Sequence, residues 1–165
     1  MQLQRLMKTG AAIALLIGAP LAAGAIGAIA SVNAPSFYTG LNQPSWAPPP
    51  SVFGPVWTAL YLLMGIAAFL VWRTRGWEGA RGALTLFLVQ LVFNAIWSWL
   101  FFHWRLGTAS CADIVVLLIL VAALTVWFLR IRPLAGALLV PYAAWVTFAT
   151  ALNFSIVRMN PAMFR

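Results

Sequence analysis

The sequence predicts an all-α membrane protein built as one bundle of five transmembrane helices. Apolar residues make up 64% of its 165 residues and charged residues only 7%, whereas a soluble domain carries about 25% charged residues. Five apolar runs each reach the roughly 20 residues that a helix needs to cross a bilayer. Because these runs use nearly the whole chain, we expect a single domain over residues 1–165 and no separate soluble domain.

The first apolar run has two possible interpretations, a secretory signal or a retained helix. The five predicted helices cover about residues 6–29, 51–72, 83–102, 108–129 and 134–157. Two basic residues, Arg5 and Lys8, lie at the start of the first run, as in a signal peptide. The run is long for a signal core, however, and small residues recur every four positions, at Gly10, Ala14, Gly18 and Ala22. This spacing lets helix backbones approach closely in lipid, so we expect a retained transmembrane helix.

The one long connection, residues 31–50, is predicted to form a stiff lid. Four prolines between positions 44 and 50 remove amide donors and fix the backbone, so no helix forms through them. A helix can begin near Ser51, because Pro55 is tolerated in a first turn. Trp57 and Tyr61 then share one helix face and point inward. The alternative is a tight loop with aromatic anchors at the membrane surface.

One face of the third predicted helix combines polar and aromatic side chains. Its members are Gln90, Asn94, Trp97, Ser98 and Phe101. An amide inside a bilayer is costly unless it is hydrogen-bonded, so this face is expected to point into the bundle. The aromatic neighbours favour a lined ligand space. Hydrogen bonds between helices would need no ligand, and both interpretations stay open.

The fifth predicted helix carries a bulky ring, a small residue and an amide in line. Trp145, Ala149 and Asn153 follow one another at intervals of four and therefore lie on one face. Binding sites are largely apolar, with few polar groups that fix orientation. The aromatic faces of the second, third and fifth helices thus favour a flat, mostly apolar ligand.

The charge pattern gives an orientation and argues against nucleic-acid binding. The net charge is +8, but the ten lysines and arginines lie at helix ends and form no basic stripe. With five spans, seven of them fall on the N-terminal side and three on the other. The positive-inside rule then predicts a cytoplasmic N-terminus, with the proline-rich loop and the C-terminus outside. This rule carries less force for an outer membrane.

Histidine and cysteine each occur once. His103 lacks the partners that a zinc site needs, and Cys111 has no second cysteine for an internal disulfide. Nucleophilic catalysis also lacks its partner groups. We therefore expect no metal site and no required cofactor.

The chain resembles the TspO/MBR family, the tryptophan-rich sensory and translocator proteins that include the peripheral-type benzodiazepine receptor. Three segments carry the resemblance: NQPSWAPPPSVFGPVWTALY (42–61), QLVFNAIWSWLFF (90–102) and PYAAWVTFATALNF (141–154). Their order and spacing agree with that family. Nine tryptophans in a five-span chain of this length are also unusual.

The resemblance implies a homodimeric five-helix protein with a pocket under the first loop. In this family the pocket binds tetrapyrroles, that is porphyrins and haem, and in some members benzodiazepine-site ligands. The matching positions are Tyr38, Trp46, Trp57, Tyr61, Asn94, Trp97, Ser98, Trp145, Ala149 and Asn153. Trp57 and Trp145 correspond to the tryptophans tied to porphyrin photochemistry in the family. We expect these two residues to form facing walls of one pocket.

Three functions are compatible with these features. Binding and sensing of a tetrapyrrole is favoured. Light- and oxygen-dependent porphyrin degradation is an alternative, as is transport of porphyrins or other small hydrophobic ligands. The carboxylates of a tetrapyrrole are expected near the pocket mouth, because the loop side offers as cations only Arg105, Arg158 and Arg165.

Overall fold

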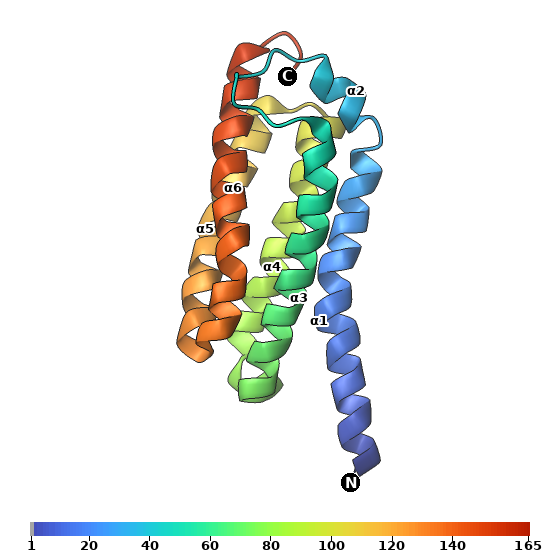
Figure 1. Cartoon of the computed structure of the whole chain (residues 1–165), viewed down its shortest axis with the longest axis vertical. Coiled ribbons are helices and arrows are strands. Elements are labelled where there is room, and N and C mark those ends of the chain that lie inside the picture. Colours follow the sequence, from blue (N-terminus) through green and yellow to red (C-terminus); the bar gives the residue numbers. More distant parts are fainter. Residues whose placement is uncertain (1) are drawn as a thin grey trace.

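The fold is a bundle of five long helices with a short helix and a loop across one end (Figure 1). The computed structural model describes residues 2–165, with side chains from residue 9 onward. In chain order the elements are α1 (Gln2–Ala30), α2 (Ala34–Thr39), the 3-10 turn η1 (Pro50–Val52), α3 (Phe53–Gly79), α4 (Arg81–Ser98), the π-helical turn η2 (Trp99–His103), α5 (Gly107–Ile131) and α6 (Pro133–Met159).

Each of the five long helices is long and apolar enough to cross a membrane. The qualifying stretches are Thr9–Ala30, Pro50–Gly79, Arg81–His103, Gly107–Ile131 and Pro133–Met159. Each stretch overlaps one predicted span, and the described residues form helices, turns and loops but no strand. The predicted all-α, five-helix membrane fold is therefore confirmed.

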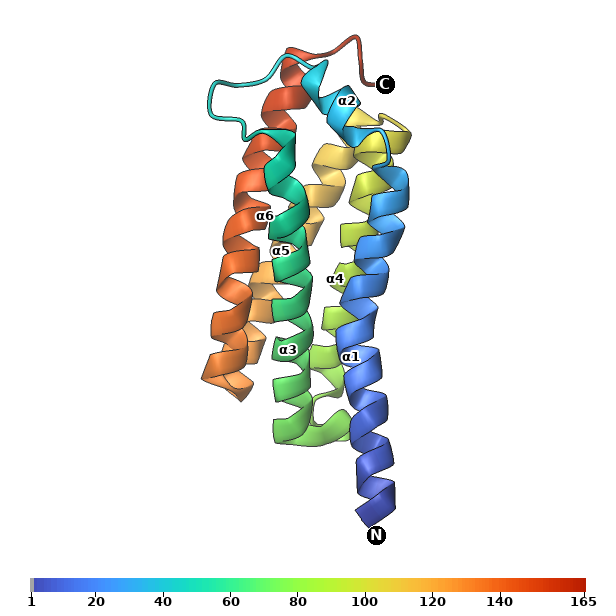
Figure 2. The same cartoon turned by 45° about the vertical axis from the view of Figure 1, so that its right-hand side comes forward.

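The helices α3 and α4 lie between α1 on one side and the pair α5 and α6 on the other. A single residue, Arg132, joins α5 to α6, and its extended backbone is the conformation that a residue before proline prefers. This short connection makes α5 and α6 antiparallel neighbours. Residues 31–50 and the C-terminus lie at one end of the bundle, and the N-terminus lies at the other (Figure 1 and Figure 2).

The second helix continues past its predicted end. The sequence predicts a helix to Trp72 and a short loop from Arg73 to Arg81, but α3 continues to Gly79. The helical backbone is interrupted once, at Gly76, where φ is 69°. Glycine reaches this left-handed region without steric cost. Apolar content marks the part of a helix that lies in lipid, and a helix can extend beyond that part where charged side chains reach water.

The third helix ends in a π-helical turn where a regular α-helix is predicted. The regular helix α4 ends at Ser98, and η2 continues to His103. A π-turn places one extra residue in the turn and therefore changes which side chains share a face. The ring of Trp97 packs against Phe101 at 5.3 Å and also against Phe102 at 5.7 Å, between centroids. Two successive phenylalanines thus reach the interior.

Prolines determine where the helices in and after the proline-rich segment begin. The short helix α2 carries Pro35 in its first turn, where proline is tolerated. Pro49 has an extended backbone, and Pro50 opens η1. The helix therefore starts close to Ser51, with Pro55 in the first turn of α3. This predicted helix start is confirmed.

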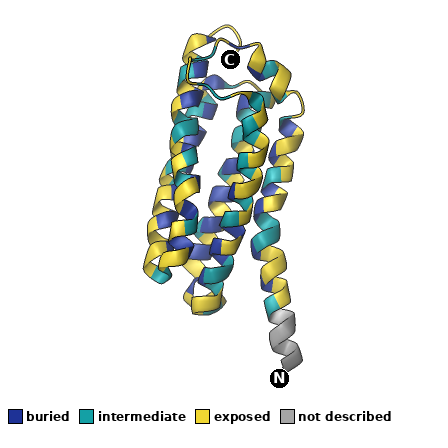
Figure 3. Cartoon of the chain, in the orientation of Figure 1, coloured by how far each residue is buried: buried dark blue, intermediate teal, exposed yellow. Residues whose placement is uncertain are grey.

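The helices pack closely against one another in the part of the bundle farthest from the loop. Its fully buried side chains include Leu16, Met64, Phe87, Leu124 and Leu139. Gly65 lets α1 and α3 touch, because a Cβ atom at this position would lie 2.9 Å from the Cα of Ile17. Figure 3 shows the result along the bundle, with buried residues on inward faces and exposed residues around the outside.

Candidate functional site

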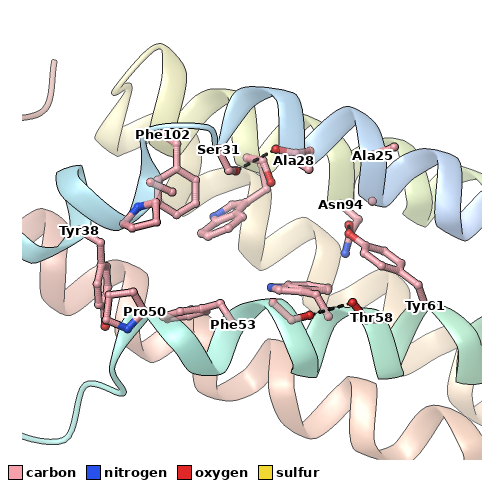
Figure 4. Close-up of a pocket in the computed structure, with 18 of the residues that line it drawn as sticks. Ala25, Ala28, Ser31, Tyr38, Pro50, Phe53, Thr58, Tyr61, Asn94 and Phe102 are labelled. Atoms are coloured by element: carbon pink, nitrogen blue, oxygen red, sulfur yellow. Dashed lines mark hydrogen bonds between the residues drawn. The ribbon is translucent and has the colours of Figure 1, made fainter.

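A cavity of about 630 Å³ lies beneath the loop, between α1, α3 and α4 (Figure 4). This volume falls in the range of about 300–1,000 Å³ that is typical of small-molecule sites. The lining residues are Leu21, Gly24, Ala25, Gly27, Ala28 and Ser31 from α1 and its end; Ala34, Pro35, Tyr38, Pro50 and Ser51 from α2 and η1; Phe53, Gly54, Trp57, Thr58 and Tyr61 from α3; and Asn94, Trp97, Ser98 and Phe102 from α4 and η2.

Aromatic rings at intervals of four form the α3 wall. Phe53, Trp57 and Tyr61 all line the cavity, as expected for residues on one helix face. The rings of Trp57 and Tyr61 are stacked, with centroids 5.5 Å apart and planes inclined by 27°. Behind them, Trp57 meets the edge of Tyr142 of α6 at 6.2 Å. These contacts fix the Trp57 ring in the wall.

The α4 wall is fixed by a hydrogen bond to α6. Trp97 lines the cavity, and its indole N–H donates to Oδ1 of Asn153 at 3.1 Å. Asn153 is 2% exposed, and its Nδ2 donates to Sγ of Cys111 at 3.0 Å and to Oγ of Ser110 at 3.4 Å. Asn153 therefore does not line the cavity but orients a ring that does.

A buried hydrogen-bond network forms the deep end of the cavity. The Tyr61 hydroxyl donates to Oδ1 of Asn94 at 2.7 Å, and Nδ2 of Asn94 donates to the Tyr142 oxygen at 3.0 Å. Tyr142 in turn donates to Oε1 of Gln90 at 2.7 Å. The amide face of α4 therefore serves both predicted roles, since it joins helices and also lines a cavity.

Asn94 keeps hydrogen-bonding capacity for a ligand. A carboxamide has two N–H donors and two lone pairs on its oxygen. The network uses one donor and one lone pair of Asn94. Because this side chain also lines the cavity, it can offer one donor and one acceptor to a bound molecule.

Small residues of α1 complete the cavity opposite α3 and α4. A Cβ atom at Gly24 would lie 2.5 Å from the Tyr61 ring, and one at Gly27 would lie 3.0 Å from Oγ of Ser98. Both glycines therefore admit a side chain from a neighbouring helix against the α1 backbone. The Tyr61 ring reaches from α3 to α1 in this way.

The loop covers the cavity with Tyr38 of α2. The Tyr38 ring is buried and packs edge-on against Phe53, with centroids 5.3 Å apart. Its hydroxyl donates to the carbonyl oxygen of Pro48 at 3.1 Å, and its own carbonyl accepts a hydrogen bond from the Gln43 side chain. Burial raises the pKa of the Tyr38 phenol above its usual 10. The phenol therefore stays neutral and keeps this hydrogen bond at physiological pH.

Six of the ten predicted site residues line the cavity, namely Tyr38, Trp57, Tyr61, Asn94, Trp97 and Ser98. The other four lie outside its lining. Trp46 is 48% exposed on the loop and packs against Phe148 at 5.7 Å. Trp145 packs against Phe53 at 5.9 Å, and Ala149 is part of the core packing. Asn153 acts through Trp97, as described above.

The expected arrangement of Trp57 and Trp145 as facing walls of one cavity differs from the structure. Trp57 lines the cavity, whereas Trp145 lies beyond Phe53 in a layer of aromatic rings with Phe148. The sequence places both residues on inward faces of their helices. It does not specify which neighbouring helix each face meets, and α6 packs directly against α3 here.

Sequence reasoning missed the α1 wall, Phe102 and also Phe53, whose interval of four from Trp57 could have identified it. The α1 wall consists of small apolar side chains and one leucine, which have no chemical signature of a binding site. Phe102 follows Phe101 directly and lies off the predicted face of a regular helix. The π-helical turn that brings it inward leaves no mark in the periodicity of the sequence.

A model of the TspO/MBR family matches residues 16–159. The Tryptophan-rich protein TspO of Chlorobaculum tepidum is 41% identical over 152 residues, which cover 90% of this chain and 96% of that protein. The Tryptophan-rich sensory protein of Cereibacter sphaeroides is 40% identical over 144 residues, covering 87% and 85%. The Translocator protein of Homo sapiens is 41% identical over 126 residues and covers 75% of each chain.

Proposed function

Because the chain belongs to the TspO/MBR family, we propose that it is an integral membrane protein that binds and senses tetrapyrroles, namely porphyrins or haem. The observation that carries this proposal is the aromatic cavity beneath the loop, with Asn94 as its deep polar group. A relative is named a sensory protein, which agrees with a role in sensing.

The shape and chemistry of the cavity suit a flat aromatic macrocycle. Indole and phenol rings line it from α3, α4 and the loop, and each stacked ring contributes about 0.5–1.5 kcal/mol beyond the burial of its area. The free donor and acceptor of Asn94 are placed to meet a ring nitrogen or a carbonyl group. Few polar groups in an apolar cavity fix the orientation of a ligand.

The charge distribution favours a position outside the cavity for the carboxylates of a tetrapyrrole. None of the described lining residues is charged, and burial of an unpaired carboxylate is costly. At the loop end, the guanidinium of Arg105 lies 4.6 Å from the centroid of the Phe37 ring. We therefore propose that the macrocycle is buried and that the carboxylates lie at the loop end, within reach of water and arginine.

A porphyrin titration tests the binding function. Purified protein in detergent should quench protoporphyrin IX fluorescence or shift its absorbance at saturable stoichiometry. Trp57→Ala should weaken binding by about 30-fold, or ~2 kcal/mol, because it removes stacking and apolar contact. Trp127→Ala is the matched control, since Trp127 is exposed near the opposite end of the bundle. Absence of binding by the parent protein would contradict the proposal.

Light-driven porphyrin degradation is a second candidate, favoured by the stacked pair Trp57 and Tyr61 in the cavity wall. Both side chains can be oxidised, and both would touch a bound macrocycle. In this scheme an excited porphyrin exchanges an electron with Trp57, and molecular oxygen is the final oxidant. Illuminated complexes should bleach in air and stay coloured without oxygen. Equal bleaching of porphyrin with and without the protein would exclude this activity.

We also propose that two copies associate through α1. Gly10 and Gly18 have nothing within 4 Å of an added Cβ atom, and Ala14 and Ala22 are exposed. This row of small residues faces away from the bundle, where a second helix can approach closely. Gly18→Leu should reduce the cross-linked dimer. An unchanged yield in Gly18→Leu and Ala22→Leu would move the interface elsewhere.

We propose a bacterial cell membrane as the location, with the loop and C-terminus outside. Both lie at one end of the bundle (Figure 1), and the opposite side holds most of the arginines and lysines. Ser36 and Ala162 are exposed at that end. Single cysteines at these two positions, in a Cys111→Ser background, should react with an impermeant reagent added outside. Labelling of the two positions from opposite sides would overturn the topology.

A further inference from the structure

The wall of the cavity is incomplete between α1 and α3. Figure 4 looks into the cavity between α1 and α3, with Ala25 and Ala28 on one edge and Thr58 on the other. These three residues line the cavity and are exposed in the structure, as are Leu21 and Gly54 on the same two helices. We call the gap between these five residues the slit.

The slit lies between two stretches that are long and apolar enough to cross a membrane. Both of its edges fall within stretches that qualify as membrane spans, Thr9–Ala30 and Pro50–Gly79. From Leu21 to Ala28 the α1 edge is roughly 10 Å long, at 1.5 Å per residue. In a bilayer that covers these two stretches, the opening would face acyl chains in the half of the membrane nearer to the loop.

The hydroxyl groups at and next to the edges of the slit are hydrogen-bonded to the backbone, so they can lie against lipid. The Thr58 hydroxyl donates to the carbonyl oxygen of Gly54 at 2.9 Å, and the Ser31 hydroxyl donates to Gly27 at 2.8 Å. Each hydroxyl is thus satisfied within its own chain segment and leaves no unpaired donor at the opening. Between residues 21–28 and 51–61, the structure has no side-chain hydrogen bond that would hold the slit closed.

The loop end is tied down by hydrogen bonds across the chain. Nδ2 of Asn160 donates to the carbonyl oxygen of Asn42, and the Asn42 backbone N–H donates to Oδ1 of Asn160, both at 2.8 Å. The last residue is held as well, because the Arg165 backbone N–H donates to Arg105 at 2.9 Å and its carbonyl accepts from Gly107 at 3.2 Å.

Aromatic packing holds the same end. The Phe37 ring of α2 lies 6.4 Å from each of Phe101 and Phe102 and 5.9 Å from Phe164, between centroids. The guanidinium of Arg105 covers the Phe37 ring. A path that lifts the loop from the bundle breaks these contacts and the Asn42–Asn160 hydrogen bonds, whereas a path through the slit breaks none of them.

We infer that the cavity is open to the bilayer through the slit between α1 and α3, and that its ligand enters from the membrane while the loop stays closed. The inference rests on the proposed tetrapyrrole binding for the identity of the ligand. A hydrophobic macrocycle partitions into lipid, so the membrane supplies it directly to the opening.

Binding kinetics in proteoliposomes test the route with protoporphyrin IX as the probe. Ala28→Phe and Thr58→Phe fill the slit and should slow both association and dissociation by about tenfold. Ala59→Phe is the matched control, because Ala59 is exposed on α3 but does not line the cavity, and it should keep both rates within twofold. Asn160→Ala releases the loop and should leave the association rate within twofold. Unchanged association in the slit variants, or faster association in Asn160→Ala, would overturn the inference.

A second measurement needs no tetrapyrrole. The tryptophan fluorescence of Trp57→Phe is subtracted from that of the parent protein, which leaves the signal of Trp57. Both proteins are measured in bilayers with brominated acyl chains. Bromine should quench this difference signal in the parent background and much less in the Thr58→Phe background. Absence of quenching in the parent means a closed slit and refutes the inference even if porphyrin binds. Quenching without porphyrin binding refutes the tetrapyrrole assignment and leaves the opening to lipid standing.

Discussion

The two halves of the bundle differ in how closely their helices approach. In the closed half, farthest from the loop, α1 touches α3 at Gly65, and Gly82 accommodates the Trp127 ring of α5. In the open half, next to the loop, α1 and α3 separate around the cavity, and Gly54 has nothing within 4 Å of an added Cβ atom. The same five helices thus form a closely packed core at one end and enclose a cavity at the other.

This difference shows that side-chain size alone does not open a membrane bundle. Glycines occur in both halves, but only in the closed half do they bring two helix backbones into contact. In the open half, the glycines of α1 receive side chains from α3 and α4, and aromatic rings line the remaining space. The hydrogen-bond network from Tyr61 to Gln90 lies between the closed half and the open half of the bundle.

The largest expected effect is on the stability of the closed half. Gly65→Val places a side chain against the α1 backbone, and overpacking of this kind costs up to about 3 kcal/mol. The thermal midpoint should then fall by about 6–12 °C, at about 2–4 °C for each kcal/mol. Gly54→Val, at a position with open space, is the control and should shift the midpoint by less than about 2 °C. Equal shifts in the two variants would remove the distinction between the halves.

The boundary between the halves should be the next most sensitive region. Asn94→Leu keeps the approximate side-chain volume but leaves the hydroxyl of Tyr61 without its acceptor and that of Tyr142 without a donor. Loss of partners for buried polar groups costs about 1–3 kcal/mol. Chemical denaturation should report this loss without any ligand. If stability is unchanged while porphyrin affinity falls, Asn94 contributes to ligand binding and not to the stability of the bundle.

A smaller effect is expected where Tyr61 rests on Gly24. Gly24→Ala should destabilise the protein by about 1 kcal/mol, because the added methyl group meets the tyrosine ring. In a Tyr61→Ala background the same change should cost close to nothing. A double-mutant cycle measures this coupling directly. Additive effects in the cycle would mean that the two residues do not share this space.

The smallest effect is expected at Trp145. Its buried indole N–H has no hydrogen-bond partner among the described residues, so Trp145→Phe removes a polar group without breaking a bond. Stability should change by less than about 0.5 kcal/mol, and porphyrin affinity should stay within twofold because Trp145 lies outside the lining. Strong loss of light-driven bleaching in this variant would still assign Trp145 a role in the photochemistry. Large loss of affinity would mean that the ligand extends beyond Phe53, outside the described cavity.

The sequence by itself determined the fold class and the identity of most aromatic wall residues. Five apolar runs of spanning length require five helices, since a backbone in lipid must satisfy its own hydrogen bonds. The prolines fixed where α3 begins, and an interval of four then placed Trp57 and Tyr61 together. The amides of the third helix had to face inward, because hydrocarbon offers them no partner.

Tertiary structure alone decided which faces meet and where space remains. The α1 wall, the slit and the exclusion of Trp145 from the lining depend on the distances between neighbouring helices, and periodicity within one helix carries no information about those distances. The same applies to Phe102, since its inward position depends on the π-helical turn at Trp99–His103. A sequence specifies which side chains must be buried, whereas packing determines whether they fill a core or line a cavity.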